Sequence, residues 1–263
     1  MKVDFFFRFR YAKCGDNMKN YKLTIQYDGA RYRGWQVQGN TENTIQGKLQ
    51  SVLSQLDGAT VEVHGSGRTD AGVHAKGQVT SVKLTSDPDC QTILDYCAAH
   101  LPQDIAVISV EPADARFHAR LNAKSKRYIY RIWNSAVPNV FERKYVYQLS
   151  EVLNLDAMEQ AATLLVGTHD FRSFCGLRRF KKSTIRTIYS IKIQAIGDEV
   201  RISYEGDGFL NLMVRILTGT LIEVGLGKRQ PEEMTSILDA KDRSAAGITM
   251  PPEGLCLDAV FYE

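Results

Sequence analysis

Paired cysteines, long hydrophobic runs and a dominant charge of one sign are all missing from this chain of 263 residues. None of the five cysteines belongs to a Cys-x-x-Cys pair, and their wide, uneven spacing predicts neither a zinc motif nor a disulfide framework. The cysteines are Cys14, Cys90, Cys97, Cys175 and Cys256. A reducing cytoplasm is the simplest compartment for such a chain, so we expect a cytoplasmic protein.

No apolar run approaches the roughly 18 residues that a membrane-spanning helix needs. The run from Phe5 to Phe7 is interrupted by Arg8 and Arg10 before a signal-peptide core can form. A net charge of +3 and a pI of about 8.5 permit a nucleic-acid partner without demanding one. The length suits one large domain or two of roughly 100 to 150 residues.

The stretch from Val61 to Lys76, VEVHGSGRTDAGVHAK, is the most informative part of the chain. A short β-type run leads into a loop with glycines at 65, 67 and 72, and a second β-type run follows. A loop between strands commonly presents a reactive side chain in a cleft. Glycines at this density predict positive φ angles or close backbone approach. The loop presents Arg68, Thr69 and Asp70.

Other interpretations of this loop are weaker or less specific. An aspartate among glycines is often a turn former that binds its own backbone. A phosphate-binding P-loop would end in Gly-Lys-Ser/Thr, which is absent here. A dinucleotide-binding turn would lead into a helix, whereas this loop leads into a strand pattern. What remains beyond a simple turn is the carboxylate of Asp70 close to the guanidinium of Arg68.

The segment GRTDAGVHA resembles the catalytic motif of the tRNA pseudouridine synthase A family, TruA, in which the aspartate is essential. The resemblance covers nearly everything after Met18. Further blocks that resemble the family, in its order, are YDGARYRGWQ, FHARLNAKSKRYIYRI, THDFRSF, GDGFLNLMVRILTGTLIEVG and AGITMPPEGLCLDAV.

Hydrophobic periodicity predicts an α+β chain with helices packed on an antiparallel or mixed sheet. Strands are expected at 21–27, 61–64, 78–84, 105–110, 124–133, 185–195, 200–205 and 255–262. Helices are expected after a capping box at Asn43, from Ile93 to Leu101, around Met158–Leu165, from about Phe209, and near Pro231–Leu238. The resemblance implies two ferredoxin-like α/β-sandwich halves that share a continuous, mainly antiparallel sheet with a central cleft. We expect domains at 18–115 and 116–263, preceded by an N-terminal extension, 1–17.

Arg215 lies in the segment Leu210–Leu217, which is apolar almost all the way round and therefore predicts a buried helix. A buried guanidinium needs a partner, because an isolated buried charge is very costly. The alternative is that Arg215 extends its charge to the surface. The resemblance places this arginine against the catalytic aspartate, so we predict a pair with Asp70 that lowers the pKa of the carboxyl and keeps it ionised.

Tyr128 and Arg68 are the predicted substrate-binding residues beside Arg215. A tyrosine on a strand is most often a core residue, but the basic neighbours of Tyr128 suit a base stacked on its ring. By resemblance Tyr128 lies over the target base, a role that Tyr130 fits less well. Arg68 is an ordinary phosphate-binding loop arginine or, as the resemblance implies, fills the space that a flipped nucleotide leaves. His74 is a less convincing acid or base, because a histidine that ends a loop is more often structural.

The densest basic cluster is predicted to follow the RNA backbone, although a charge run is often only a solvated face. Its members are Arg178, Arg179, Lys181, Lys182 and Arg186, with Arg31, Arg33, Lys124, Lys126 and Arg127 as further candidates.

The resemblance predicts an enzyme that isomerises uridine to pseudouridine at positions 38, 39 and 40 of the tRNA anticodon arm, with Asp70 as the catalytic residue. No cofactor and no metal are expected, and the resemblance implies a homodimer. Two alternatives are a paralogue with the same chemistry on another RNA, such as ribosomal RNA, and a non-catalytic RNA-binding protein on the same scaffold. An intact Arg-Thr-Asp sequence argues against the latter, since a binding module has no use for an aspartate that repels phosphate.

Overall fold

The first half of the chain folds in the order β-α-β-β-α-β. The computed structural model describes residues 18–263 except 40, 42, 178, 180 and 181. The elements of the first half are β1 (Lys19–Tyr27), α1 (Ile45–Asp57), β2 (Val63–Gly65), β3 (His74–Leu84), α2 (Cys90–His100) and β4 (Ile105–Ala113). β1 lies between β3 and β4, and β2 pairs with β3. This is the connectivity of a ferredoxin-like sandwich.

The second half repeats this plan with three short additions. Its elements are β5 (Ser125–Asn134), β6 (Tyr147–Leu149), α3 (Leu155–Leu165), β7 (Gly167–Asp170), β8 (Ile185–Ile196), β9 (Glu199–Gly206), α4 (Met213–Gly225), α5 (Glu233–Ala240) and β10 (Leu255–Phe261). Without β6, β7 and α5, the order is again β-α-β-β-α-β. β5 lies between β10 and β9, and β8 follows β9. The predicted α+β fold class is therefore confirmed.

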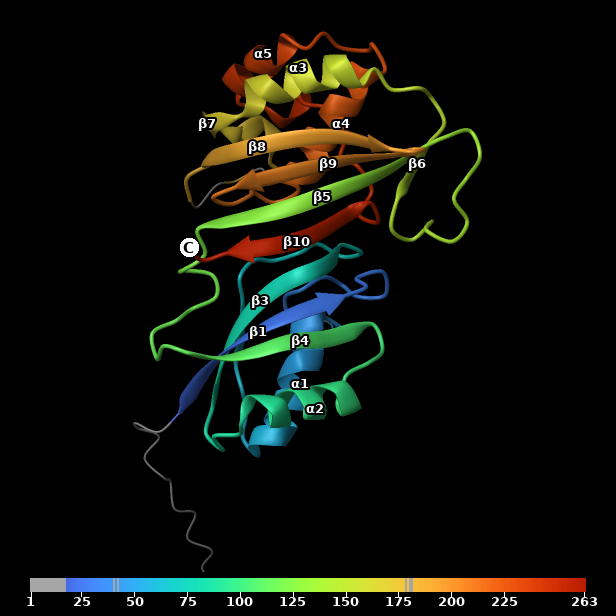
Figure 1. Cartoon of the computed structure of the whole chain (residues 1–263). Coiled ribbons are helices and arrows are strands. Elements are labelled where there is room, and N and C mark those ends of the chain that lie inside the picture. Colours follow the sequence, from blue (N-terminus) through green and yellow to red (C-terminus); the bar gives the residue numbers. More distant parts are fainter. Residues whose placement is uncertain (1–17, 40, 42, 178, 180–181) are drawn as a thin grey trace, which may run out of the picture.

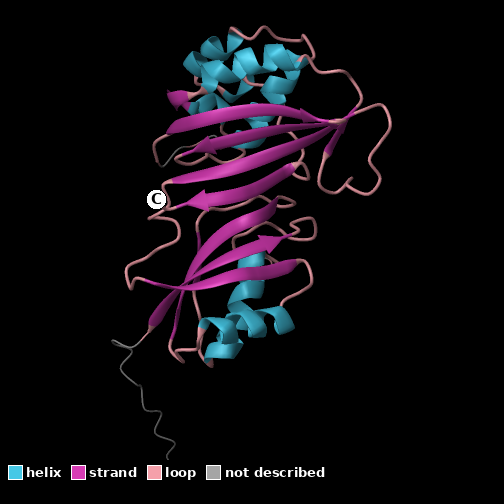
Figure 2. Ribbon diagram, in the orientation of Figure 1, coloured by secondary structure: helices cyan, strands magenta, loops and turns pink. Residues whose placement is uncertain are grey.

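The last strand, β10, joins the two halves into one ten-stranded sheet. It pairs antiparallel with β5 along its length and parallel with β3, where Cys256 faces His74 and Leu257 faces Ala75. Helices α1 and α2 lie at one end of the molecule, and α3, α4 and α5 lie at the other (Figure 1). Figure 2 shows the strands stacked between these two groups of helices and running across the long direction of the molecule. We propose that the domain boundary lies between residues 115 and 116; the predicted extension at 1–17 falls outside the described residues.

The alternation along β5 shows why these residues form a strand in the middle of the sheet. Tyr128, Tyr130 and Ile132 are buried, whereas Ile129 and Arg131 between them are only half-buried. This is the predicted division into two faces with a period of two residues. The core continues into α4, in which eleven of the thirteen residues are buried. The sequence prediction of a buried helix here is therefore confirmed.

Two predicted helix starts are wrong. The N-cap of α1 is Thr44, whose hydroxyl accepts a hydrogen bond from the Gly47 amide, whereas the side chain of Asn43 donates to the carbonyl of Arg31. The second error is at α4, which begins at Met213 and not near Phe209. Its N-cap, Leu212, has φ 60° and ψ 2°, a left-handed conformation that interrupts the apolar pattern without a sequence signal.

Candidate active site

The loop between β2 and β3 holds its backbone by hydrogen bonds on several sides. The side-chain amide of Gln78 donates to the carbonyl of Gly67 at 3.0 Å. The hydroxyls of Tyr27 and Thr69 are 2.8 Å apart, and the Trp35 amide donates to the Thr69 carbonyl at 3.0 Å. Thr69 is therefore turned inward and buried, whereas Asp70 keeps 31% of its side chain exposed.

Two glycines allow other segments to pack closely against this loop. A Cβ at Gly29 would lie 2.0 Å from the carbonyl oxygen of Val73, so no side chain fits there. Gly72 has φ +81°, and a Cβ would lie 2.9 Å from the ring of Pro252. The loop is thus held between the turn after β1 and the segment before β10. The predicted need for glycine at position 72 is confirmed.

Asp70 faces Arg215 across the boundary between the halves. Nη1 of Arg215 lies 3.5 Å from Oδ2 of Asp70, and Nε of Arg215 donates to the carbonyl of Met250 at 2.6 Å. Arg215 projects from the first turn of α4 and is only 14% exposed. The carbonyl of Met250 therefore fixes the guanidinium while its Nη1 points to the carboxylate.

The predicted direction of the Asp70 pKa is wrong. Burial raises the pKa of Asp70 above its ordinary value, and the charge of Arg215 offsets this only in part. The physical reason is that the ion pair is a single long contact, whereas desolvation acts on the whole carboxylate. Asp70 is consequently a better base and a more reactive anion than a solvated aspartate.

Tyr128 lies on β5 near this pair, with its ring buried. Its ring meets that of Phe209 edge to face, with centroids 5.2 Å apart and planes at 83°. Burial raises the pKa of Tyr128, and the nearby Tyr27 and Asp70 add to the effect. The phenol therefore stays protonated at neutral pH.

Arg68 is exposed beside the pair and is held by a relay of two glutamines. Its Nε donates to Oε1 of Gln36 at 3.0 Å, and Nε2 of Gln36 donates to Oε1 of Gln46 at 2.8 Å. Nε2 of Gln46, on α1, in turn donates to the carbonyl of Val63 at 2.9 Å. Sequence reasoning did not identify these glutamines, because amides carry no pattern of their own.

All four predicted site residues line one pocket of about 600 Å³. Asp70 and Arg68 come from the first half of the chain, and Tyr128 and Arg215 from the second. Sequence reasoning missed the apolar part of the wall. It is formed by Phe209, Leu210, Leu212, Leu177 and Leu255.

Part of the predicted basic cluster lies at the same pocket. Its described members there are Arg179, Lys182 and Arg186, with Lys126 from the further candidates. Arg120 also lines this pocket, although the sequence prediction did not include it. Arg178 and Lys181 fall outside the described residues. Other candidates are engaged elsewhere: Arg127 pairs with Asp258 at 2.8 Å, and Arg31 pairs with Asp104. These five pocket cations come from β5, β8 and the loops before these strands.

His74 lines a different pocket, of about 570 Å³, together with Asp28 and Tyr145. Its Nδ1 accepts a hydrogen bond from the Gly29 amide, and its Nε2 lies 3.0 Å from the carbonyl of Lys144. Burial lowers the pKa of His74, which favours the neutral ring. His74 does not line the pocket that contains Asp70, and that it is neither the acid nor the base stays a prediction.

The described residues contain neither a candidate metal site nor a candidate membrane span. No group of three or more His, Cys, Asp or Glu side chains is placed there to hold a metal ion. No helix in the described part of the chain has the length and apolarity to cross a membrane. A half-buried carboxylate and a guanidinium beside aromatic rings and a rim of cations define an enzyme pocket suited to an RNA base.

Comparison with known proteins specifies this class further. The family model of tRNA pseudouridine synthase matches residues 23–122 and 161–263. A tRNA pseudouridine synthase A of Bacillus sp. (strain KSM-64) is 49% identical over 245 residues, which are 93% of this chain and 100% of that protein. A tRNA pseudouridine synthase A 2 of Bacillus anthracis is 45% identical over the same shares. The chain belongs to the TruA family of tRNA pseudouridine synthases.

Proposed function

We propose that the carboxylate of Asp70 isomerises uridine at positions 38, 39 and 40 of the tRNA anticodon arm. Family membership makes the chain an isomerase that acts on uridine in tRNA; the residue and the positions are the proposal. The supporting observation is that Asp70 faces Arg215 at 3.5 Å inside a pocket of about 600 Å³. That volume lies within the range of small-ligand sites and suits one nucleotide.

The uridine must leave its stack before it reaches Asp70. Inside a helical stem neither C1′ nor the base edge is accessible to a buried carboxylate, so the nucleotide has to be extruded. We assign to Arg68 the filling of the space that the extruded uridine leaves. Its exposure and its hydrogen bond to Gln36 support this role, because the side chain is accessible to RNA yet aimed.

The reaction breaks the N1–C1′ bond, rotates the uracil and forms a C5–C1′ bond. C5 loses a proton and N1 ends with one, so atoms and electrons balance without an external reactant. Attack at C1′, addition at C6 and removal of the 2′ proton are all compatible with a carboxylate at Asp70. Arg215 keeps that carboxylate aimed. Tyr128 holds the detached base, and its protonated hydroxyl assists removal of the C5 proton by hydrogen bonding to the group that accepts this proton.

We further propose a cytoplasmic homodimer in which one tRNA contacts both subunits. The resemblance is the main support for the dimer. Exposed apolar side chains on the segment between β5 and β6 supply a candidate contact: Val137, Val140 and Phe141, the last being 93% exposed. Light scattering on wild type and Phe141→Ser tests this. A monomeric wild type would overturn the dimer, and a dimeric variant would remove Phe141 from the interface.

One cellular experiment separates the proposal from its alternatives. Pseudouridine is mapped across total RNA from cells lacking the protein and from cells complemented with wild type or Asp70→Ala. Loss at the anticodon arm, restored only by wild type, supports the proposal. Loss in ribosomal RNA instead identifies a paralogue with another target. Full rescue by Asp70→Ala identifies a binding protein.

A purified-enzyme assay tests the role of Asp70 directly. Asp70→Asn retains the shape of the side chain but removes the negative charge. We expect turnover on an anticodon-arm RNA to fall by at least about 10²-fold, since the catalytic anion is lost. RNA affinity is expected to be retained, because a carboxylate repels phosphate.

A further inference from the structure

Three cations from separate elements line the Asp70 pocket. Arg120 precedes β5, Lys126 lies on β5 and Arg186 lies on β8. None of the three forms an ion pair within 4.0 Å with a carboxylate among the described residues, whereas Arg215 at the same pocket is paired with Asp70. A concentration of unpaired like charge is unfavourable in the free protein. Such an arrangement is expected where an anion binds.

Lys126 is held in place by the backbone of the catalytic loop. Its Nζ donates to the carbonyl of Ser66 at 2.7 Å, and a Cβ at Gly67 would lie 3.2 Å from Nζ. The ammonium therefore lies against the loop immediately before Arg68. An ammonium has three donors, so one bond to Ser66 leaves capacity for an acceptor in the pocket.

Arg186 has a similar arrangement. Nη1 of Arg186 donates hydrogen bonds to the carbonyls of Ser183 and Ile185. Within the described part of the chain, Nε and Nη2 therefore keep N–H groups for another acceptor. Arg120, Lys126 and Arg186 reach the pocket from different parts of the chain. A tetrahedral phosphate suits this arrangement, because its oxygens accept hydrogen bonds from several directions.

We propose that Arg120, Lys126 and Arg186 form a phosphate seat that binds one backbone phosphodiester of the RNA beside the extruded uridine. This inference rests on the proposed function, since the phosphate belongs to the RNA that Asp70 acts on. The three positive charges offset the repulsion that the carboxylate of Asp70 exerts on a phosphate in the same pocket. The seat anchors the strand while the base turns inward.

The seat has a distinctive proton signature. Burial, together with the charges of Arg120 and Arg186, lowers the pKa of Lys126 to about 8, and Asp207 opposes this weakly. A bound phosphate raises the pKa of the ammonium, because an opposite charge favours the charged form. RNA binding near pH 8 is therefore accompanied by proton uptake at Lys126. In a Lys126→Arg variant the guanidinium is already fully charged at pH 8, so this side chain takes up no proton when RNA binds.

The test uses an anticodon-arm RNA and the full chain with Asp70→Asn, so that no product forms during binding. Each phosphate around the target uridine is replaced in turn by a neutral methylphosphonate. At one position, we expect the affinity for the RNA to fall about 10-fold. Adding Lys126→Met should abolish sensitivity at that position and lower the salt slope by about 1. The matched control is Lys192→Met on β8, an exposed lysine outside the pocket lining. It should leave the methylphosphonate sensitivity and the salt slope unchanged.

Calorimetry at pH 8 in two buffers of different ionisation enthalpy measures the proton uptake. Uptake in the reference protein and none in Lys126→Arg supports the seat. Uptake that is the same in Lys126→Arg, or the same methylphosphonate sensitivity in Lys126→Met, overturns it. A failure of the proposed function can be distinguished from a failure of the phosphate seat. If wild type makes no pseudouridine in this RNA, the function is wrong; if it does while the seat variants bind normally, only the seat is wrong.

Discussion

Nη1 of Arg215 lies 3.5 Å from Oδ2 of Asp70, although 145 residues separate the two along the chain. Asp70 is on the loop between β2 and β3, and Arg215 is on α4. The pocket therefore exists only when the two ferredoxin-like halves are joined through β3 and β10. The stability of that junction and the geometry around Asp70 are therefore linked.

Asp70→Asn is expected to stabilise the protein at neutral pH. Burial raises the pKa of Asp70 in the folded chain above its unfolded value. A carboxyl with a raised folded pKa favours folding below its unfolded pKa and loses that contribution as the pH rises through the folded pKa. At pH 7 the ionised group is thus a net cost that asparagine avoids. Urea unfolding at pH 7 should show a higher midpoint for Asp70→Asn.

The control for this effect is Asp239→Asn on the exposed side of α5, which should leave the midpoint unchanged. The gain for Asp70→Asn should also shrink as the pH is lowered toward 4. A lower midpoint for Asp70→Asn at pH 7 would show that the pair with Arg215 outweighs desolvation.

Arg215→Met removes the cation that partly offsets the burial of Asp70. The pKa of Asp70 should rise further, so the acid limb of the kcat/KM profile moves to higher pH. Activity at pH 7 should fall by about 10- to 100-fold, because both ionisation and aim are impaired. Arg215→Lys retains a positive charge and is expected to shift the profile less. An unshifted profile in Arg215→Met would mean that the arginine acts only in packing.

Tyr128→Phe deletes one oxygen and leaves the edge-to-face contact with Phe209 in place. RNA affinity should stay within about twofold, while turnover falls about 10- to 100-fold as C5 proton removal slows. Uridine deuterated at C5 should then show a primary isotope effect on turnover. Tyr130→Phe is the matched control on the same face of β5, since it loses only a hydrogen bond to Pro251, at about 1 kcal/mol. Full turnover in Tyr128→Phe would restrict the residue to stacking.

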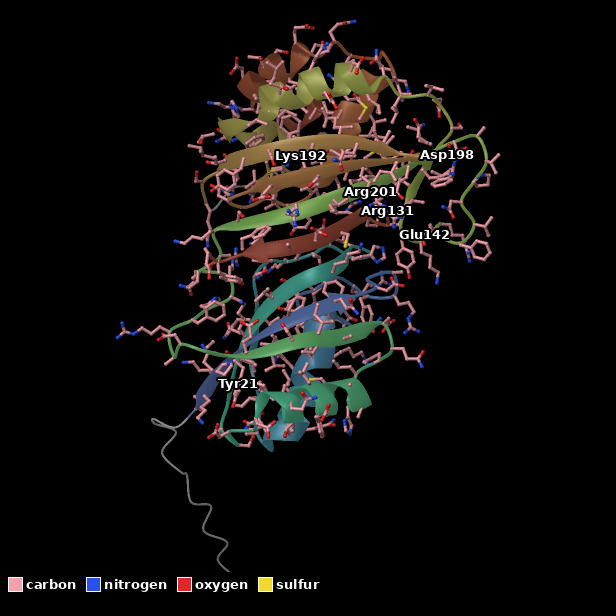
Figure 3. The ribbon with its side chains drawn as sticks, viewed as in Figure 1. Tyr21, Arg131, Glu142, Lys192, Asp198 and Arg201 are labelled. Carbon is pink, nitrogen blue, oxygen red and sulfur yellow. The ribbon has the colours of Figure 1, made fainter. Side chains whose placement is uncertain are left out.

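The ion pairs of Glu199 make the stability of the fold depend on pH in the acid range. Its carboxylate accepts from Nε of Arg131 at 2.7 Å and from Nε of Arg201 at 2.6 Å, and Arg131 also pairs with Glu142. Figure 3 shows Arg131, Arg201 and Glu142 close together toward one end of β5 and β9. These hydrogen bonds lower the pKa of Glu199 from 4.5 to about 2. A depressed folded pKa stabilises the fold above the unfolded value and loses this effect as the pH falls toward 2.

The measurement for Glu199 is urea unfolding between pH 6 and pH 3. Between pH 6 and pH 3, wild type should lose about 2 kcal/mol more than Glu199→Gln, since pH 3 lies about 1.5 units below the unfolded pKa of 4.5 and one pKa unit is about 1.4 kcal/mol. Glu232→Gln, at an exposed position, should follow wild type. Parallel curves for wild type and Glu199→Gln would place the acid sensitivity elsewhere.

Much of the fold was predictable because its signals are local. The alternation of Tyr128, Tyr130 and Ile132 on β5 and the apolar circumference of α4 each report burial directly. The start of α4 was not predictable, because a leucine at φ 60° leaves no trace in an apolar sequence. The short strands β6 and β7 were also missed; with three or four residues each they carry little alternation, and no pair of valines like Val61 and Val63 at β2 marks them.

The site was predictable in its members but not in its electrostatics. The apolar neighbours of Arg215 and the family resemblance were enough to predict that Asp70 and Arg215 form a pair. The direction of the Asp70 pKa depends on how much solvent reaches the carboxylate and on one 3.5 Å contact, neither of which a sequence contains. The same holds for Lys126, whose position against Ser66 appears only in three dimensions.

The chain closes its own sheet with its last strand, since β10 is the only element that pairs with both β3 and β5 among the described residues. During translation, both halves can therefore begin to fold before anything connects them. We therefore expect Asp70 and Arg215 to come together only when β10, residues 255–261, has paired with both β3 and β5.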